Sequence, residues 1–161
     1  KETSDILLSG IDHDLYESEP LNRALSSSTE LITEREQIRW ARTKQGQFRE
    51  DVLAAWGGKC AVSAISKAEF LIASHIKPWS QCTTSQEKID PSNGISLSRN
   101  YDDMFEPGHI TFDEDGRIIL SELLEYHEAQ SFGINERAKL RIVEDSREEY
   151  LKYHRANIFR E

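Results

Sequence analysis

The chain has 161 residues, of which 37% are hydrophobic and 30% charged, and its formal net charge at pH 7 is −9. This composition predicts one well-solvated globular domain, and the acidic excess argues against nonspecific nucleic-acid binding through bulk charge. Two cysteines without a CxxC spacing exclude a disulfide scaffold or a four-cysteine zinc site. The chain has no signal-peptide pattern and no bilayer-length apolar run, so we expect a cytoplasmic protein without membrane association.

Charge changes sign along the first third of the chain. Residues 1–34 carry eight acidic side chains against two basic ones, whereas residues 35–60 carry six basic side chains against three acidic ones. This change predicts two regions with different partners. We interpret residues 1–34 as an acidic linker or the tail of a preceding domain, and residues 35–161 as a separate domain.

A long amphipathic helix is predicted over residues 34–56. Thr33 is a plausible N-cap, and Glu36 occupies the capping-box position three residues later. Gly46 is expected to interrupt the helix, and Gly57-Gly58 to end it. The apolar stripe consists of Ile38, Ala41, Phe48, Val52, Leu53 and Trp56.

Short strands and helices are predicted over the rest of the chain. The expected strands cover residues 60–65, 69–76 and 95–97, and residues 80–92 are expected to form a loop. A helix capped by Ser98 should end at Phe105, before a hairpin formed by residues 109–112 and 117–120 around an Asp-Gly turn. Two further helices are expected over residues 121–131 and 145–156. Together these elements predict an α+β fold.

Residues that could act in catalysis or metal binding concentrate between positions 70 and 106. His75 ends a strand-like apolar run, Asn93 precedes a glycine, and Asp102, Asp103 and Glu106 follow within a predicted helix. A histidine with an unperturbed pKa near ~6.5 can accept a proton at neutral pH, and carboxylates can bind a divalent cation. The combination indicates metal-assisted hydrolysis. Taken alone, His75 is more readily interpreted as a core histidine at a strand end, and the sequence around it is what favours a catalytic role. Asn93 can also be part of an ordinary Asn-Gly turn, which is compatible with a bracing role.

Several motifs occur in a recognisable order along the chain. They are Gln45-Gly46-Gln47-Phe48-Arg49, Cys60-Ala61-Val62-Ser63, Ala73 to Trp79, Asn93 to Leu97, Met104 to Gly108, and Tyr150 to Arg155. This order resembles the HNH nucleases of the ββα-metal (His-Me finger) superfamily, and in particular a bacterial group with the motif His75-Ile76-Lys77-Pro78-Trp79. The resemblance covers residues 35–161. It implies an α+β fold with a ββα-metal core, flanking helices and an additional β-hairpin.

The resemblance implies a divalent-metal-dependent endonuclease that hydrolyses DNA phosphodiester bonds, as the cleavage module of a restriction or defence protein. In this interpretation His75 is the general base that activates water. Asn93 braces the loop between the two strands and orients the histidine.

The expected metal ligands depart from the family pattern. Ser74 stands where many HNH nucleases have a metal-binding aspartate or histidine, and Asp102 where a helical histidine is common. Glu106 lies four residues after Asp102, on the same helical face, whereas Asp103 points elsewhere and is expected to be solvated. Oxygen ligands of this kind suit Mg²⁺ or Mn²⁺. The alternative for Asp102 is an exposed acid favoured by the helix dipole.

Four basic residues are candidates for nucleic-acid binding, and each could instead be an ordinary surface charge. They are Lys77, Arg99, Arg49 and Lys44. Arg49 has a second interpretation, in which it ties the first helix to the catalytic span. Because the sequence starts at Lys1 and not at Met, we expect an upstream recognition domain. Cleavage of both strands would imply a homodimer.

Two other functions compete with this assignment. Ser74 and Asp102 leave open a catalytically degenerate HNH scaffold that serves as a nucleic-acid-binding or protein-interaction module. A small-molecule hydrolase is disfavoured, because the sequence has no nucleophile elbow and no zinc-binding signature.

Overall fold

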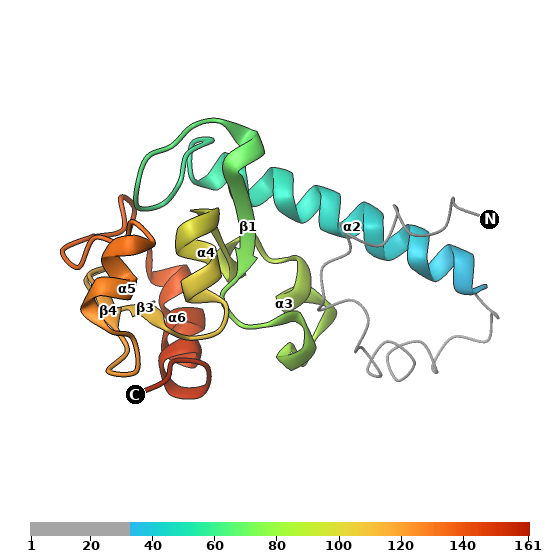
Figure 1. Ribbon diagram of the computed structural model, residues 1–161. Coiled ribbons are helices and arrows are strands. Elements are labelled where there is room, and N and C mark those ends of the chain that lie inside the picture. The colour runs from blue at the N-terminus through green and yellow to red at the C-terminus, as the bar shows by residue number, and fades with distance from the viewer. Residues whose placement is uncertain (1–32) are drawn as a thin grey trace, which may run out of the picture.

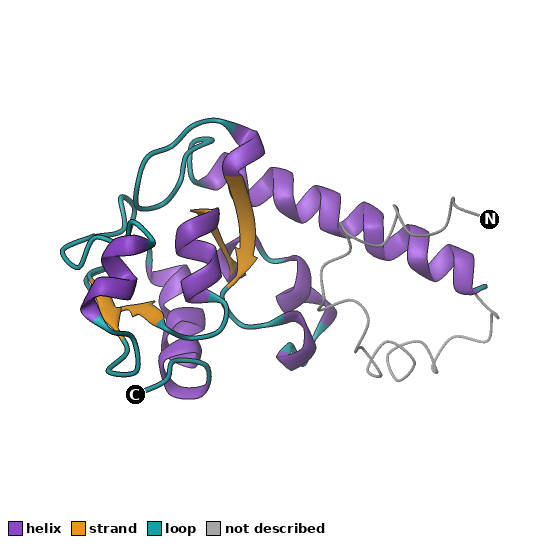
Figure 2. Cartoon of the chain, viewed as in Figure 1, coloured by secondary structure: helices purple, strands orange, loops and turns teal. Residues whose placement is uncertain are grey.

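The computed structural model describes residues 33–161 (Figure 1). The acidic segment predicted for residues 1–34 therefore lies outside the described residues, apart from its last two. The described chain consists of helices and two small antiparallel sheets, which confirms the predicted α+β class (Figure 2).

The longest element is helix α2 (Glu34–Ala55), which forms the predicted capping box at its start. The Thr33 hydroxyl accepts from the Glu36 amide, and the Glu36 carboxylate accepts from the Thr33 amide at 2.9 Å. The expected interruption at Gly46 is wrong, since α2 continues through this glycine. The first half of α2 extends away from the other elements (Figure 1). Its second half packs into the core through Phe48 and Val52.

A two-stranded hairpin lies next to this second half. Strand β1 (Leu71–His75) pairs with the antiparallel strand β2 (Gly94–Ser98), in a register that places His75 opposite Gly94. Gly94 has an extended backbone, so its glycine is not required by a turn. A Cβ atom there would lie 2.1 Å from Cγ2 of Val52, which shows that close approach of α2 is the reason for glycine at this position.

The connection between β1 and β2 has more structure than the predicted loop over residues 80–92. It contains two short 3₁₀ turns, Trp79–Gln81 and Pro91–Asn93, and the one-turn helix α3 (Ser85–Ile89). The Thr84 hydroxyl caps α3 by accepting from the Glu87 amide at 3.1 Å. The connection contacts the end of β1, where the Lys88 carbonyl oxygen lies 2.9 Å from Nε2 of His75.

Helix α4 (Arg99–Phe105) follows β2 directly and packs against both strands of the hairpin. This β1–β2–α4 succession is the ββα arrangement expected from the sequence. Ser98 precedes α4 as predicted, but its hydroxyl donates to the side chain of Asn100 at 2.7 Å and makes no capping bond to the helix. Phe105 is fully buried in the core.

The predicted strand over residues 60–65 is wrong. These residues form turns, and Ala64 has a positive φ of 59°. The buried sulfur of Cys60 accepts from the amides of Val62 and Ser63 and from Ser98 in β2, at 3.3 to 3.5 Å. A side chain that collects nearby backbone donors in this way favours a compact turn over an extended strand.

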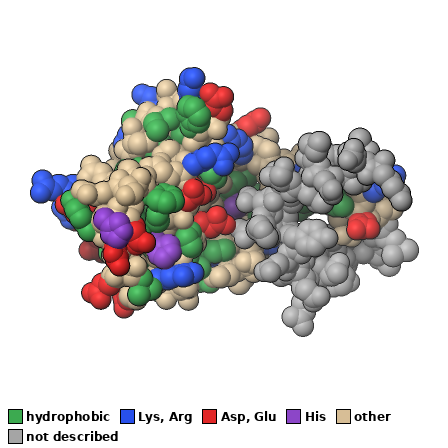
Figure 3. All heavy atoms as spheres, viewed as in Figure 1, with side chains coloured by type: hydrophobic (Ala, Val, Ile, Leu, Met, Phe, Trp, Pro, Cys, Tyr) green, Lys and Arg blue, Asp and Glu red, His purple; other side chains and the backbone are tan. Residues whose placement is uncertain are grey.

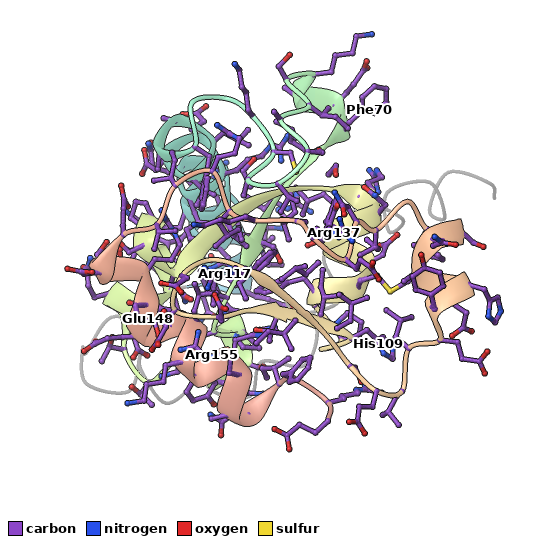
Figure 4. All side chains as sticks on the ribbon, turned by 90° about the vertical axis from the view of Figure 1, so that its left-hand side faces the viewer. Phe70, His109, Arg117, Arg137, Glu148 and Arg155 are labelled. Carbon is purple, nitrogen blue, oxygen red and sulfur yellow. The ribbon has the colours of Figure 1, made fainter. Side chains whose placement is uncertain are left out.

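The second hairpin is confirmed, with β3 (Ile110–Phe112) antiparallel to β4 (Ile118–Leu120). Helix α5 (Tyr126–Ser131) is shorter than the predicted segment, and α6 (Asp145–Asn157) matches its prediction closely. Helix α6 crosses β3 and packs against the turn that precedes β2. Figure 4 shows Glu148 and Arg155 of α6 next to each other, where they form an ion pair.

Acidic, basic and apolar side chains are interspersed on the surface shown in Figure 3. No helix within residues 33–161 combines the length and the apolar character that a bilayer crossing requires.

Candidate active site

A groove of about 600 Å³ lies between the end of β1, the end of α4 and the residues that follow α6. Among its lining residues are Ser74, His75, Asp102, Glu106, His154 and Arg160. The structure therefore brings the predicted base and both predicted carboxylates to one surface depression, although they are up to 31 positions apart in the sequence.

His75 is held in a defined orientation at the end of β1. Its imidazole stacks on the Phe48 ring, with centroids 3.9 Å apart and an interplanar angle of 4°, and meets the edge of Trp79. Its Nε2 lies 2.9 Å from the carbonyl oxygen of Lys88. Because a carbonyl can only accept, Nε2 carries the proton, and the neutral ring has its lone pair on Nδ1. The ring thus has a fixed tautomer with Nδ1 as the proton acceptor.

Asn93 is fully buried behind this histidine. Its Oδ1 accepts from the Lys77 amide at 2.7 Å, and its Nδ2 donates to the carbonyls of Lys77 and Glu87, at 3.1 and 3.0 Å. The Glu87 carbonyl immediately precedes the Lys88 carbonyl to which His75 is bonded. The side-chain amide of Asn93 therefore links Lys77, at the start of the β1–β2 connection, to Glu87 in α3, and holds the backbone around the histidine.

The two predicted metal ligands lie one helical turn apart. The Glu106 amide donates to the Asp102 carbonyl at 2.9 Å, so the α-helical spacing extends to Glu106 and both carboxylates share a face. Asp102 is buried, with 6% exposure, and Glu106 is exposed. Ser74, also buried, lines the same groove.

The donor set fits a hard divalent cation. Two carboxylates and a hydroxyl are oxygen donors, and Mg²⁺ commonly takes one or two protein carboxylates and completes its shell with water and substrate phosphate. Within residues 33–161 there is no group of three or more histidine, cysteine or acidic side chains arranged to hold a metal. A cation here would accordingly depend on water and substrate oxygens for its remaining ligands.

Lys77 and Arg49, two of the predicted nucleic-acid contacts, have protein partners. The Lys77 ammonium donates to the Glu87 carboxylate at 3.0 and 3.2 Å, and it lies 4.9 Å from the centre of the Tyr153 ring. The Arg49 guanidinium donates to the carbonyls of Leu71 and Ala68, both at 2.9 Å. Arg49 thus ties α2 to the start of β1, as its second interpretation predicted.

The other two predicted contacts lie outside the groove. Arg99 is exposed at the start of α4, and Lys44 is half-buried on α2. None of the four predicted basic residues lines the depression that contains His75. Their contacts with nucleic acid stay predictions.

The Glu87 carboxylate is kept ionised by its surroundings. Burial raises its pKa, but hydrogen bonds from the Thr83 amide and from Lys77 outweigh that effect and hold the pKa below its usual value. The charged pair between Glu87 and Lys77 therefore persists at neutral pH, directly beside the backbone that orients His75.

Sequence reasoning missed the contribution of the residues after α6. Asn157, Ile158, Phe159 and Arg160 line the groove together with His75. The sequence gives no signal for this placement, because these residues have no periodic pattern and no motif. Their position depends on how α6 packs against the rest of the fold.

His154 also borders the groove, but its ring is buried in the core. Its Nε2 lies 3.0 Å from the Phe105 carbonyl and its Nδ1 2.9 Å from the Thr111 hydroxyl, while the ring stacks on Phe105. Burial is the main cause that lowers its pKa to about 4. His154 is therefore a neutral bridge between α6, α4 and β3.

Comparison with known proteins supports the HNH type of fold for the segment that contains these residues. Residues 60–113 match the family model described as HNH endonuclease. The matched segment contains β1, β2, α4 and β3, and with them His75, Asn93, Asp102 and Glu106. A search of curated proteins found no match. The match supports the HNH superfamily for this segment, and the bacterial group inferred from the motifs stays a prediction.

Proposed function

We propose that this protein is a divalent-metal-dependent HNH endonuclease that hydrolyses DNA phosphodiester bonds. One observation carries the proposal: His75, with its Nδ1 set as proton acceptor, shares a groove with Asp102 and Glu106. These three residues lie within the segment that matches the HNH endonuclease family model. We further propose that the domain comprises residues 35–161 and acts as the cleavage module of a restriction or defence protein. It would operate with an upstream recognition domain, and as a homodimer where both strands are cut.

In this proposal His75 is the general base. Its Nδ1 removes a proton from the water that attacks phosphorus. The positive charge that develops on the ring is stabilised by the Lys88 carbonyl, which accepts from Nε2 at 2.9 Å. Stacking on Phe48 keeps the ring plane fixed during proton transfer. The ring is thus oriented before the substrate binds.

Asp102 and Glu106 would hold Mg²⁺ or Mn²⁺ in this groove, and the Ser74 hydroxyl is available to a water ligand. When bound, the ion supplies positive charge opposite the phosphate and the leaving oxygen. Asn93 acts through His75: it holds the Glu87 carbonyl, and thereby the adjacent Lys88 carbonyl, in place. We regard Asn93 as a positioning residue.

A catalytically degenerate scaffold that binds nucleic acid or a protein is the second candidate. Ser74 at the usual ligand position favours it, as does the lack of three clustered His, Cys or acidic ligands within residues 33–161. The two candidates differ in whether the groove supports hydrolysis, and a cleavage assay separates them.

The direct test is plasmid cleavage by His75→Ala. We expect nicking by the unmodified protein with Mg²⁺ or Mn²⁺, no nicking with excess chelator, and a loss of at least ~10²-fold in rate for the variant, since general bases contribute ~10²–10⁴-fold. His127→Ala is the matched control, because His127 is exposed on α5 and lies outside the groove. It should cleave at the original rate.

The circular dichroism spectrum of His75→Ala should match that of the unmodified protein, to exclude unfolding as the cause. Undiminished cleavage by this variant would remove His75 as the base. A protein that shows no cleavage with either ion, yet binds DNA, would favour the degenerate scaffold.

A further inference from the structure

The groove contains one strongly basic side chain that the proposed chemistry does not use. Among its described lining residues, Arg160 is the single lysine or arginine. The same surface includes the carboxylates of Asp102 and Glu106, which repel a phosphate when no cation is bound. An arginine at this place has the charge and the fork of donors that a phosphodiester requires.

The backbone around Arg160 is fixed. The amides of Ile158 and Phe159 both donate to the His154 carbonyl at 2.9 Å, which turns the chain at the end of α6. The Arg160 amide then donates to the carbonyl of Gly108 at 2.9 Å. Arg160 is thus attached to the turn between α4 and β3, two residues after Glu106.

Gly108 makes this attachment possible. Its φ is +85°, and a Cβ atom there would lie 2.0 Å from the carbonyl oxygen of Ile158. Any side chain at position 108 would displace the residues after α6 from their contact with Gly108. The hydrogen bond and the close contact are independent observations, and both place the chain bearing Arg160 against the rim of the groove.

We propose that Arg160 binds a phosphate of the DNA strand that occupies the groove, next to the phosphate to be cleaved or at that phosphate itself. The proposal rests on the proposed function and identifies how the groove holds its substrate. Arg160 provides a positive charge from a segment remote in sequence from the ββα core. Neither Lys77 nor Arg49 provides it, because their charged groups are already bonded to Glu87 and to backbone carbonyls.

The test measures DNA affinity in a protein that does not cut. A short fluorescein-labelled duplex is titrated with His75→Ala, and with the same variant carrying Arg160→Ala, Arg160→Lys or Arg137→Ala, at several salt concentrations. Arg137→Ala is the matched control, because this substitution removes the same charge from the loop after α5 (Figure 4), outside the groove.

We expect Arg160→Ala to weaken binding by about 10-fold, the value of one charge-assisted contact. The slope of log affinity against log salt should fall by about 0.9, since one phosphate contact is lost. Arg160→Lys should keep the slope and recover part of the affinity, and Arg137→Ala should change neither quantity. Equal affinities and slopes for Arg160→Ala and Arg137→Ala would overturn the proposal, as would the absence of measurable binding by His75→Ala.

A second variant displaces the segment without removing its charge. Gly108→Ala should weaken DNA binding as Arg160→Ala does. Gly116→Ala introduces comparable backbone strain in the second hairpin, where φ is +79°, and should leave DNA affinity unchanged. Equal DNA affinities for the two folded glycine variants would contradict the proposed role of the contact between Gly108 and the residues after α6.

These measurements separate the inference from the proposed function. If the unmodified protein does not cleave DNA but Arg160→Ala selectively weakens binding, the phosphate contact stands and the hydrolytic function fails. If the unmodified protein cleaves and, in the His75→Ala background, Arg160→Ala binds DNA like Arg137→Ala, the inference alone fails.

Discussion

Two histidines of this chain lie in contrasting environments within one groove wall. His75 stands at the end of β1 with one nitrogen bonded to the Lys88 carbonyl, and His154 is buried between the Phe105 carbonyl and the Thr111 hydroxyl. Burial lowers the pKa of His154 to about 4, so this ring stays neutral at physiological pH. His154 therefore supports the packing of α6, whereas the proposed function assigns proton transfer to His75.

The lowered pKa of His154 predicts a pH-dependent stability. In the unfolded chain its pKa returns to about 6.5, so below that pH the unfolded state takes up a proton that the native state does not. The free energy of unfolding should therefore fall as the pH falls from 6.5 toward 4, by about 2 kcal/mol from this group at about pH 5. Urea unfolding of His154→Gln at about pH 7 and about pH 5 should show a smaller drop than the unmodified protein.

The exposed His127 provides the control for this measurement. His127→Gln should keep the pH dependence of the unmodified protein, because the ring is 73% exposed on α5. An equal drop in the free energy of unfolding for His154→Gln and the unmodified protein would contradict the assignment of this acid sensitivity to His154.

At the level of residues, the sequence identifies candidates and not their partners. His75 and Asn93 can be singled out because each lies in a contiguous motif with a chemical rationale. The Lys88 carbonyl cannot be foreseen as the partner of His75, since α3 lies in a segment without a clear helical pattern. The pairing of Lys77 with Glu87 is hidden for the same reason. Arg160 has no sequence signal at all.

At the level of secondary-structure elements, α2 and β2 approach each other closely next to the site. The Gly94 backbone meets Val52 and Phe48 of α2, and the Gly94 carbonyl accepts from Trp56 Nε1 at 3.3 Å and from Arg147 of α6. Helices α2 and α6 are therefore both attached to the first residue of β2. This arrangement supports the strand end at which His75 is paired with Gly94.

Two glycine-to-alanine changes should have opposite effects on stability. Gly94→Ala places a methyl group 2.1 Å from Val52 Cγ2, and such overpacking costs about 1–3 kcal/mol. Gly46→Ala lies in the exposed middle of α2 with no atom within 4 Å, so higher helix propensity should stabilise the fold by about 0.8–1 kcal/mol. Urea unfolding of both variants measures the difference. A destabilising Gly46→Ala or a neutral Gly94→Ala would contradict these contacts.

Elements with a strong periodic or turn signal could be predicted, and those defined by a tertiary contact could not. The capping box of α2, the β3–β4 hairpin and α6 follow local rules, and the structure confirms them. Residues 60–65 have the composition of a strand, yet the sulfur of Cys60 gathers amides from its own turn and from β2. That contact spans 38 residues and leaves no local pattern.

Across the described molecule, the ββα core is enclosed by segments from both ends of the chain. Helix α2 supports the hairpin, and α6 with the residues after it closes the groove. The α+β class and the ββα order could be predicted, since both follow from the order of local elements. The closure by the C-terminal residues could not, because it depends on contacts between elements more than 40 residues apart, such as His154 with Phe105.

The predicted domain boundary leads to a test on a shortened chain. The buried hydrophobic core among the described residues extends from Ala41 to Leu151. We therefore expect a fragment of residues 33–161, which retains the Thr33 cap, to unfold in one cooperative transition and to cleave DNA. Removal of residues 1–32 should also strengthen DNA binding, since it reduces the excess of negative charge.

Calorimetry measures the cooperativity of unfolding, the plasmid assay measures cleavage, and the fluorescence titration measures the DNA affinity of the fragment. Non-cooperative unfolding would move the domain boundary upstream. Weaker DNA binding than that of the full chain would assign residues 1–32 a direct part in substrate recognition.

The hydrogen bond between the Arg160 amide and the Gly108 carbonyl has a practical consequence for how the protein is handled. Any peptide joined after Glu161 starts two residues after Arg160, whose amide donates to the Gly108 carbonyl at the rim of the groove. If the groove binds DNA as proposed, a purification tag at that end competes with DNA for the same space and lowers the apparent affinity. In the fragment of residues 33–161, a tag joined ahead of α2 attaches to the helix end that extends away from the core (Figure 1). Assays of cleavage and binding by this fragment are therefore best made with the tag ahead of Thr33.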